Sequence, residues 1–492
     1  MMSSRFNFSL VFRFLSKLLM FNGAFMLLCL SASIYYNEPE DYIPLSLSGV
    51  ITILFGLLIY FVAKRYNIRS EMTKRDGYLI VTFGWVLMTF SGSLPYILSG
   101  TITDFSSAVF ETISGYSTTG ASVLTDIESV NKDILLWRSL TQWIGGMGII
   151  VLTVAILPIL GIGGMQLFVA EAPGISPDKL QPRIKDTARR LWIIYVSLTA
   201  VETVLLMSGG FSFYDALNHS FTTMATGGFS TFNSSAAEFT PYIQYILIVF
   251  MFFAGTNFTL TYFGFHGKLR KIWENEEFRF YTLMITVVTA ILTTVVYLSG
   301  WSNSDFEQSF RDVLFQTVSI ITTTGFVSVD YTLWPPLVMM VIFLLMFVGA
   351  SAGSTAGGVK IVRHIILIKN AFKSFKRQLH PKAIIPVRLN GKAVNESVVY
   401  TVLAFMMVYI MTYTTGVIIL TALGVDFLTA LGAVATSLGN IGPGIGNVGP
   451  VDNFAHLSAS VKWILSFFML IGRLELFTVL MLFTPYFWRR MH

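Results

Sequence analysis

Residues 110–120 read FETISGYSTTG, a short apolar stretch that ends in a glycine-containing turn. Stretches of the same kind recur as NHSFTTMATGG at 218–228, FQTVSIITTTG at 315–325 and a segment that ends LGNIGP at 438–443. The aligned glycines are spaced by 108, 97 and 117 residues, and they are Gly120, Gly228, Gly325 and Gly442. Each turn lies between two long apolar runs. The repeating unit is therefore a span, a half-helix, a glycine-rich turn and a second span.

Each half-helix is too short to cross a membrane. About ten residues of helix reach only about 15 Å, whereas the hydrocarbon core of a bilayer is about 30 Å thick. The chain must therefore turn back inside the membrane, where non-helical backbone is tolerated only if protein buries it or if it lines water. Four such turns in one chain can surround a central axis, so the pattern predicts a pore.

The four turns offer a cation only neutral oxygen atoms. Backbone carbonyls can replace the hydration shell of a cation, glycine permits the unusual backbone conformations, and threonine adds hydroxyl oxygens. A divalent ion usually takes carboxylate ligands, and the turns contain none. We therefore expect a potassium ion, or a similar monovalent cation, in a filter made of Thr118, Thr119, Gly120, Thr226, Gly227, Gly228, Thr323, Thr324, Gly325, Asn440, Ile441 and Gly442. The fourth turn departs from the threonine-rich pattern, so its coordination need not match that of the other three.

The composition is that of a membrane protein. Of the 492 residues, 54% are hydrophobic and only 12% are charged, against about a quarter charged in soluble proteins. The net charge of +6 lies in short blocks between apolar runs, which membrane topology explains better than nucleic-acid binding. The single Cys29 gives no disulfide framework and no thiolate metal site. About ten crossings are expected, at 11–35, 45–63, 77–98, 134–160, 191–210, 241–264, 280–300, 334–360, 397–423 and 460–484.

The connections between these segments alternate in charge. Basic residues concentrate in 64–76, 266–279, 363–392 and at the C-terminal end, whereas the intervening connections carry mostly Asp and Glu. Because basic loops stay on the cytoplasmic side, both termini are predicted to be cytoplasmic. Buried helices of a soluble protein would not produce this alternation. The first apolar run lacks a small-residue cleavage site, so we interpret it as a retained helix.

These features predict an all-α polytopic membrane protein. Its four span–half-helix–span pore repeats would surround a central pseudo-fourfold axis, and two extra transmembrane helices would precede them. The expected division places the two N-terminal helices at 1–76 and the pore repeats at 77–160, 191–264, 280–362 and 397–492.

The third repeat carries a glycine cluster in its second span. Gly349, Gly353, Gly357 and Gly358 lie within ten residues, and each glycine destabilises a helix interior by roughly 1 kcal/mol relative to alanine. We expect the span to break there, in a buried or water-lined setting. Close helix packing through small residues is the alternative explanation. Lys360 ends the cluster, and its side chain either takes part in the pathway or extends to the cytoplasmic interface.

Arg473 is a charge in the last apolar run. It lies about ten residues into that run, where a charged side chain is costly and usually faces a pathway or a partner. Glu475 is only two residues away and would not face Arg473 on one helix. A pathway role and a structural partner on another helix are therefore the two explanations.

Polar side chains also recur within the half-helices. Glu111, His219 and Gln316 each lie nine residues before the aligned glycine. That distance favours hydrogen bonds that anchor a half-helix over direct ion binding. Histidine can titrate near neutral pH, but a structural role is the commoner one. Glu202 lies within a span and needs either a partner or a proton.

The chain resembles the TrkH/KtrB/HKT superfamily of potassium transporters over nearly its whole length. The resemblance rests on STTG at 117–120, TGGF at 226–229, TTGF at 323–326, GNIGPG at 439–444 and WRSLTQWIGGMG at 137–148. The two extra N-terminal spans resemble the TrkH branch of the superfamily.

The resemblance implies a function and partners. It implies potassium uptake across the bacterial inner membrane through a selective, gated, channel-like pore. It also implies that 349–360 forms an intramembrane loop that blocks the pore below the filter, with Arg473 beside it. The implied assembly is a homodimer with one pore in each subunit, together with a cytosolic TrkA-type nucleotide-binding regulatory subunit.

Two other function classes are weighed against a pore. A potassium symporter coupled to a proton or a sodium ion would need an alternating-access site, often built from inverted repeats, whereas these four repeats share one orientation. An enzyme is not indicated, since the sequence shows no metal-ligand cluster, nucleophile constellation or phosphate-binding motif. The connection 161–190 is also too short for a catalytic domain.

Overall fold

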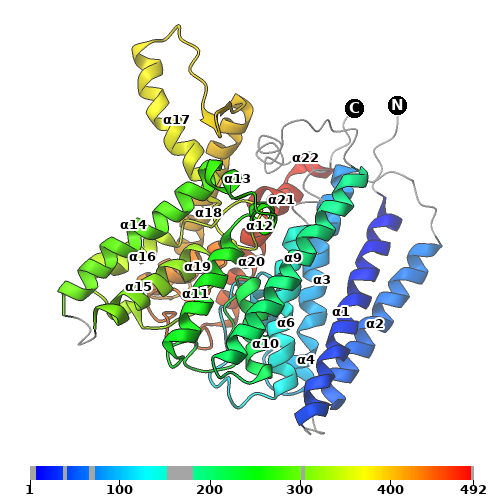
Figure 1. Ribbon diagram of the computed structural model, residues 1–492. Helices are drawn as coiled ribbons and strands as arrows, with labels where there is room; N and C mark the ends of the chain where they lie inside the picture. Colours follow the sequence, from blue (N-terminus) through cyan, green and yellow to red (C-terminus); the bar gives the residue numbers. More distant parts are fainter. Residues whose placement is uncertain (1–6, 37–41, 66–72, 152–180, 301–304, 489–492) are drawn as a thin grey trace.

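The computed structural model describes residues 7–36, 42–65, 73–151, 181–300 and 305–488. The end of the fourth expected span, most of the connection 161–190 and the C-terminal arginines lie outside the described residues. The chain is helical almost throughout (Figure 1). Its long helices are α1 (Phe8–Tyr36), α2 (Tyr42–Lys64), α3 (Lys74–Gly92), α6 (Lys132–Val151), α9 (Gln181–Ser208), α14 (Glu276–Leu298) and α18 (Glu396–Ala422).

Further helices connect or complete these. They are α4 (Leu94–Leu98), α13 (Leu269–Glu274), α16 (Pro336–Leu345), α17 (Ile361–Leu379), α22 (Pro485–Trp488) and the 3-10 helices η4 (Tyr331–Leu333) and η5 (Met481–Phe483). Within the described residues, six helices are long and apolar enough to cross a membrane, or eight if each of two bent helix pairs is one span. The two other expected crossings coincide with α6, which adjoins the undescribed 152–180, and with α16, which is only 10 residues long.

Two segments that we expected to be continuous spans are sharply bent. In 241–264, α11 (Pro241–Gly255) and α12 (Phe258–Phe265) meet at 111°. In 460–484, α20 (Ala459–Arg473) meets the continuous segment of α21 (Leu476–Leu480) and η5 at 113°. The sequence predicted a crossing at each place and gave no sign of the bend. The first bend places Asn257 as the N-cap of α12, and the second places Glu475 at a φ of 63°, outside helical geometry.

The four short helices that precede the glycine turns are all present. They are α5 (Phe105–Tyr116), α10 (Phe213–Met224), α15 (Phe306–Ile321) and α19 (Phe427–Gly439). The residue before each helix accepts a backbone N–H of the first turn with its side chain, and these residues are Asp104, Ser212, Asp305 and Asp426. Such caps satisfy free N–H groups, and a negative charge there also complements the helix dipole. Hydrogen bonds from the hydroxyls of Ser106 and Ser107 lower the pKa of Asp104 to about 2, so this cap is charged at neutral pH.

The short helices pack against neighbouring units in a regular way. α10 contacts α6, α15 contacts α11, and α5 contacts α20. In each case the partner is the second span of the preceding unit, and the contact between α5 and α20 joins the first unit to the last. The units therefore follow one another around the molecule and do not form a row.

The two N-terminal helices form a tight pair. α1 packs along α2 and also contacts α3 and α6, and the pair lies at the edge of the molecule (Figure 1, right). A Cβ added to Gly23 would lie 2.7 Å from the carbonyl oxygen of Gly49, so the two backbones approach closely. Small residues allow such contacts between membrane helices.

A basic helix and a small hairpin extend from one end of the molecule. α17 projects at the end that also carries α13 and α22 (Figure 1). Strands β1 (Arg388–Leu389) and β2 (Lys392–Ala393) pair antiparallel beyond it, and they are a detail that the all-helical prediction lacked. Asn390 and Gly391 have φ of 49° and 77°, as a two-residue type I′ turn requires.

Candidate functional site

The four glycine turns share one backbone conformation. In each turn a non-glycine residue with a positive φ is followed two residues later by a glycine with a positive φ. The first residues are Thr118, Thr226, Thr323 and Asn440, with φ of 52°, 55°, 56° and 54°. The glycines are Gly120, Gly228, Gly325 and Gly442, with φ of 84°, 73°, 82° and 108°. The residue between them donates its N–H to the carbonyl five residues earlier in all four turns, at N···O distances of 2.8–2.9 Å.

This conformation is strained. Positive φ in a non-glycine residue costs on the order of 1–3 kcal/mol and persists only where the surrounding structure enforces it. Four such residues at matched positions therefore show that the same turn is built, and held, four times.

The turns are neighbours in a closed cycle. A Cβ added to the glycine of one turn would meet a backbone carbonyl oxygen of the next turn. In order, Gly120 faces the oxygen of Gly227, Gly228 that of Thr324, Gly325 that of Ile441, and Gly442 that of Thr119. The last contact returns to the first turn. Only glycine fits at these positions, because even the widest of the four gaps would leave the added carbon 2.8 Å from the oxygen.

A second cycle of hydrogen bonds joins the same units outside the turns. One bond connects each unit to the next, and the fourth connects the last unit to the first. They run from Arg138 Nη1 to Ser230 O (3.0 Å), from Ala236 N to Val327 O (2.8 Å), from Tyr331 Oη to Gly444 O (2.7 Å) and from Phe454 N to Ser122 O (2.8 Å).

The turns border a common cavity. All four glycines line one space of about 260 Å³. Asp452 and Arg138 are the only charged side chains among the described residues that line it. Across the described chain, no group of three or more His, Cys, Asp or Glu side chains could hold a metal ion.

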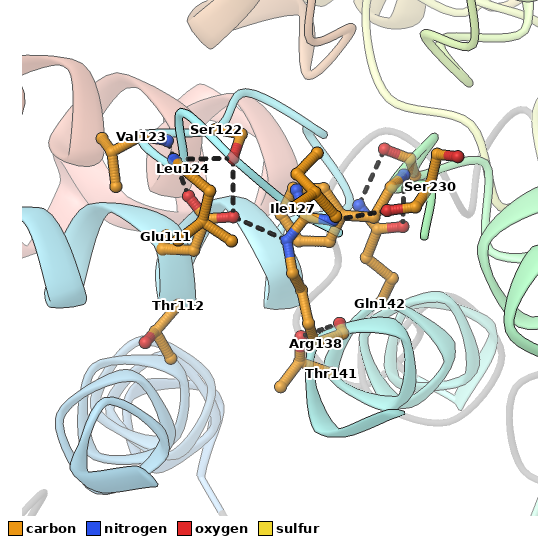
Figure 2. A network of polar contacts seen from close by, with 12 residues as sticks. Glu111, Thr112, Ser122, Val123, Leu124, Ile127, Arg138, Thr141, Gln142 and Ser230 are labelled. Carbon is orange, nitrogen blue, oxygen red and sulfur yellow. Dashed lines mark hydrogen bonds and ion pairs between the residues drawn. The ribbon is translucent and has the colours of Figure 1, made fainter. Parts of the chain in front are cut away.

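A buried ion pair fixes the first turn from behind (Figure 2). Glu111 accepts the N–H of Val123 at 2.8 Å and the hydroxyl of Ser122 at 3.0 Å, so it holds the chain that leaves the turn. Arg138 on α6 donates to Glu111 at 2.7 Å, and both side chains are almost fully buried. Since Arg138 also donates to the carbonyl of Ser230, one arginine ties the first turn to the second.

The matching polar residues of the second and third half-helices act in the same way. His219 Nε2 lies 3.0 Å from the hydroxyl oxygen of Ser230, and Gln316 donates to the hydroxyl of Ser328 at 3.3 Å. Each partner lies in the segment just after its own glycine turn. Each contact therefore anchors a half-helix to the segment that follows its turn.

Gln142 on α6 supports the second turn directly. Its amide donates to the carbonyl oxygen of Gly227 at 2.7 Å and accepts the N–H of Phe229 at 3.2 Å. The guanidinium of Arg138 lies over the Phe229 ring, 3.5 Å from its centre. Sequence reasoning did not give Arg138 or Gln142 a role. Their polarity inside an apolar span was the available signal, but their partners in the second turn and the segment after it, Gly227, Phe229 and Ser230, lie 85 to 92 residues away in the chain.

Asn440 links the fourth turn to its neighbours. Its side-chain amide donates to the hydroxyl of Thr119 at 3.0 Å and to the carbonyl of Met469 at 2.9 Å. The residue that departs from the threonine pattern therefore connects the fourth turn to the first turn and to α20.

Residues 346–360 form an irregular loop in place of a continued helix. The loop folds on itself, because Gly349 N–H donates to the carbonyl of Val359 at 2.6 Å. Lys360 turns back in the same way, and its ammonium donates to the carbonyl of Ala356 at 2.6 Å. Lys360 therefore closes the loop instead of extending away from it.

The loop contacts the inner ends of the half-helices. Gly357 N–H donates to the hydroxyl oxygen of Thr323 at 2.7 Å. The hydroxyl of Thr355 lies 3.0 Å from the carbonyl oxygen of Met224, at the end of α10. The loop therefore touches the second and third turns at the side where their half-helices end.

The bend between α11 and α12 makes room for this loop. Phe258 N–H donates to the carbonyl of Gly353 at 3.1 Å, and Gly353 has a φ of 73°. A Cβ at Gly353 would lie 3.0 Å from the side chain of Asn257, the cap of α12. The free backbone groups of the broken span and of the loop thus satisfy each other.

Arg473 meets the loop from the other side. Its guanidinium donates to the carbonyl of Thr355 at 2.6 Å and to the carbonyl of Gly145 at 3.2 Å. Arg473 is the last residue of α20 and lies at a bend, not within a continuous span as expected. Glu475 pairs instead with Arg363 at 2.6 Å, at the start of α17.

Glu202 on α9 is fully buried, and the hydroxyl of Thr223 on α10 lies beside it. The sequence alone gave it no neighbour.

Comparison with known proteins decides the family. The family model described as TrkH, a cation transport protein, matches residues 45–490. The chain belongs to the TrkH family. The Trk system potassium uptake protein TrkH of Salmonella typhimurium is 38% identical over 96% of this chain and 97% of that protein. The protein TrkG of the Trk potassium uptake system of Escherichia coli is 33% identical over 93% of this chain and 94% of that protein.

A solved structure of the TrkH family has the same fold. The crystal structure of the potassium transporter TrkH from Vibrio parahaemolyticus matches with a TM-score of 0.89 and 34% identity, covering 98% of this chain and 100% of that one. The chain is therefore a multi-span membrane protein of a transport family and not an enzyme.

The buried ion pair yields a stability prediction. Replacing Arg138 by Ala leaves Glu111 charged and buried without its partner, which costs about 3–5 kcal/mol of unfolding free energy. We expect a large drop in the thermal unfolding temperature of the detergent-solubilised protein.

The control is Arg270→Ala. Arg270 also pairs with a glutamate at 2.7 Å, but its side chain is 91% exposed, so the pair contributes little. Equal shifts in the two variants would contradict the anchoring role of Arg138.

Proposed function

We propose that this TrkH-family chain takes up potassium across the bacterial inner membrane through a selective pore at the ring of four turns. The observation that carries the proposal is the closed cycle of glycine–carbonyl contacts around a shared cavity. A ring of neutral oxygens suits a monovalent cation. The relatives that cover nearly the whole chain are named as potassium uptake proteins.

The half-helices add to the attraction for a cation. Each one ends at its turn, so the negative ends of four helix dipoles lie at the ring of turns. The filter consists of the turn residues from Thr118 to Gly120, Thr226 to Gly228, Thr323 to Gly325 and Asn440 to Gly442. We assign these four segments to pore repeats with the boundaries given by the sequence.

The loop 346–360 is proposed as the gate. Gly349, Gly353, Gly357 and Gly358 give it the freedom to fold inside the membrane, and Lys360 closes it. Arg473 holds the loop carbonyl of Thr355 and places a positive charge beside it. A cation would meet both the loop and this charge on leaving the filter.

The basic end of the molecule is proposed to face the cytoplasm. The start of α1 lies at the same end as α13, α17 and α22 (Figure 1), and basic segments stay on the cytoplasmic side of a membrane. A TrkA-type nucleotide-binding regulatory subunit would dock on this face. In the membrane we propose a homodimer, surrounded by lipid, with one pore in each subunit.

The first test replaces Gly325 by Ser. The added side chain would crowd the carbonyl of Ile441 within the ring, so discrimination between potassium and sodium should fall about tenfold or more. Currents across bilayers with known ion gradients measure this, and in the unmodified protein the reversal potential should follow the potassium gradient alone.

The matched control is Gly424→Ser. Gly424 also has a positive φ, of 86°, but no atom lies within 4 Å of an added Cβ, so backbone strain is present without crowding of the ring. Unchanged selectivity in Gly325→Ser would refute the filter. A reversal potential that shifts with a proton or sodium gradient would favour the coupled symporter.

The gate is tested with Arg473→Gln. Loss of the charge and of its hydrogen bond to the loop should raise the open probability several-fold, measured in single-channel recordings. Lys462→Gln is the control, because this buried lysine of the same helix donates to Ser107 and Ala455, away from the loop. If both variants open equally often, Arg473 has no particular role in the gate.

A further inference from the structure

We propose that the loop closes by docking Gly357 onto the filter itself, and that this docking competes with a cation for the hydroxyl oxygen of Thr323. The inference rests on the proposed pore. It goes further, because it states that filter and gate are directly linked and names the atom that they share.

Gly357 lies in a seat made by the third and fourth turns. Its N–H donates to the hydroxyl oxygen of Thr323 at 2.7 Å. A Cβ added to Gly357 would lie 2.7 Å from the Cβ of Asn440 and 2.8 Å from the carbonyl oxygen of Gly439. Thr323 and Asn440 are fully buried. This position therefore admits only glycine. It is enclosed by Thr323 and Asn440, the first residues of two filter turns, and by the carbonyl of Gly439.

The residues at the first position of each turn differ in whether they accept a hydrogen bond from the loop. In the first turn, the hydroxyl oxygen of Thr118 is buried and has no hydrogen-bond partner among the described residues. In the second turn, the hydroxyl of Thr226 donates to the carbonyl of Ala225 at 2.6 Å. Only the hydroxyl of Thr323 accepts a hydrogen bond from the loop.

The first and third turns are otherwise closely matched. Each has a pair of hydroxyls two residues apart, Ser117 with Thr119 at 2.6 Å and Thr322 with Thr324 at 2.8 Å. Since both turns carry this hydroxyl pair, the contact with the loop is what distinguishes Thr323 from Thr118 at the first position. Without the loop, the hydroxyl of Thr323 would be as free as that of Thr118.

Because the loop and the cation use the same oxygen, the binding of one weakens the binding of the other. An amide N–H presents the positive end of its dipole to the oxygen that accepts it, and a cation coordinated by the same oxygen is repelled by that end. A docked loop therefore weakens cation binding at this position. By linkage, a cation bound there weakens docking by the same factor.

The test compares four substitutions in single-channel recordings at several potassium concentrations on the side of the loop. In the unmodified protein, the ratio of open to closed time should rise with potassium. Thr323→Val, which removes the acceptor, should raise this ratio about 3- to 10-fold and abolish its dependence on potassium. Thr323→Ser keeps the hydroxyl and should retain the dependence of this ratio on potassium.

Thr118→Val is the matched control. It removes the equivalent filter hydroxyl without touching the loop, so it should alter conductance or selectivity but leave the potassium dependence of gating in place. A second variant, Gly357→Ala, does not fit the seat and should open the pore in the same direction as Thr323→Val. Monodispersity on size exclusion confirms that each variant is folded.

The outcomes separate the two proposals. If Thr323→Val and Thr118→Val gate alike, or if potassium does not affect gating in the unmodified protein, the link between filter and loop is overturned while the filter stands. If neither valine variant changes conductance or selectivity, the proposed pore itself fails.

Discussion

Four backbone turns approach one another so closely that no side chain fits between them. The rest of the molecule holds the turns at this distance. Each glycine of the ring faces a carbonyl oxygen of the next turn. Carbonyl oxygens carry partial negative charge, so bringing several together around a cavity is unfavourable without a compensating positive charge. A cation that binds between them supplies that charge. The same close approach that excludes larger residues thus creates the attraction for an ion.

The strain in the turns is balanced by contacts made behind them. Glu111, His219 and Gln316 hold the chain just after three of the turns, and Asn440 links the fourth to α20. Further out, one hydrogen bond from each unit to the next closes a second ring. Because each unit packs on the one before it, movement of one turn is opposed by its neighbours on both sides. A rigid ring of this kind differs from the loop 346–360, which rests on hydrogen bonds to carbonyls, to one hydroxyl and to the carboxylate of Glu277, and is built largely from small residues.

Much of this arrangement was readable from the sequence, because the relevant signals are local. Half-helix length, the aligned glycines and the glycine cluster in the third unit all reflect the conformation of a few consecutive residues. The bends after Gly255 and Arg473 were missed, since apolar composition continues through them and their cause is a distant loop that satisfies their backbone groups. The role of Arg138 was missed because its partners are distant in the chain: Glu111 lies 27 residues away within the same unit, and Ser230 becomes a neighbour only when the first two units pack together. The hairpin at Asn390 carried a local signal, an Asn-Gly pair, that the basic charge of the segment obscured.

The central claim is that the ring of four turns binds the transported cation. Crystals grown with rubidium in place of potassium, measured at the rubidium absorption edge, locate the ion directly. Anomalous density is expected inside the ring, between the carbonyl oxygens of Thr119, Gly227, Thr324 and Ile441. Ordered rubidium elsewhere in the protein, with none within the ring, would contradict it.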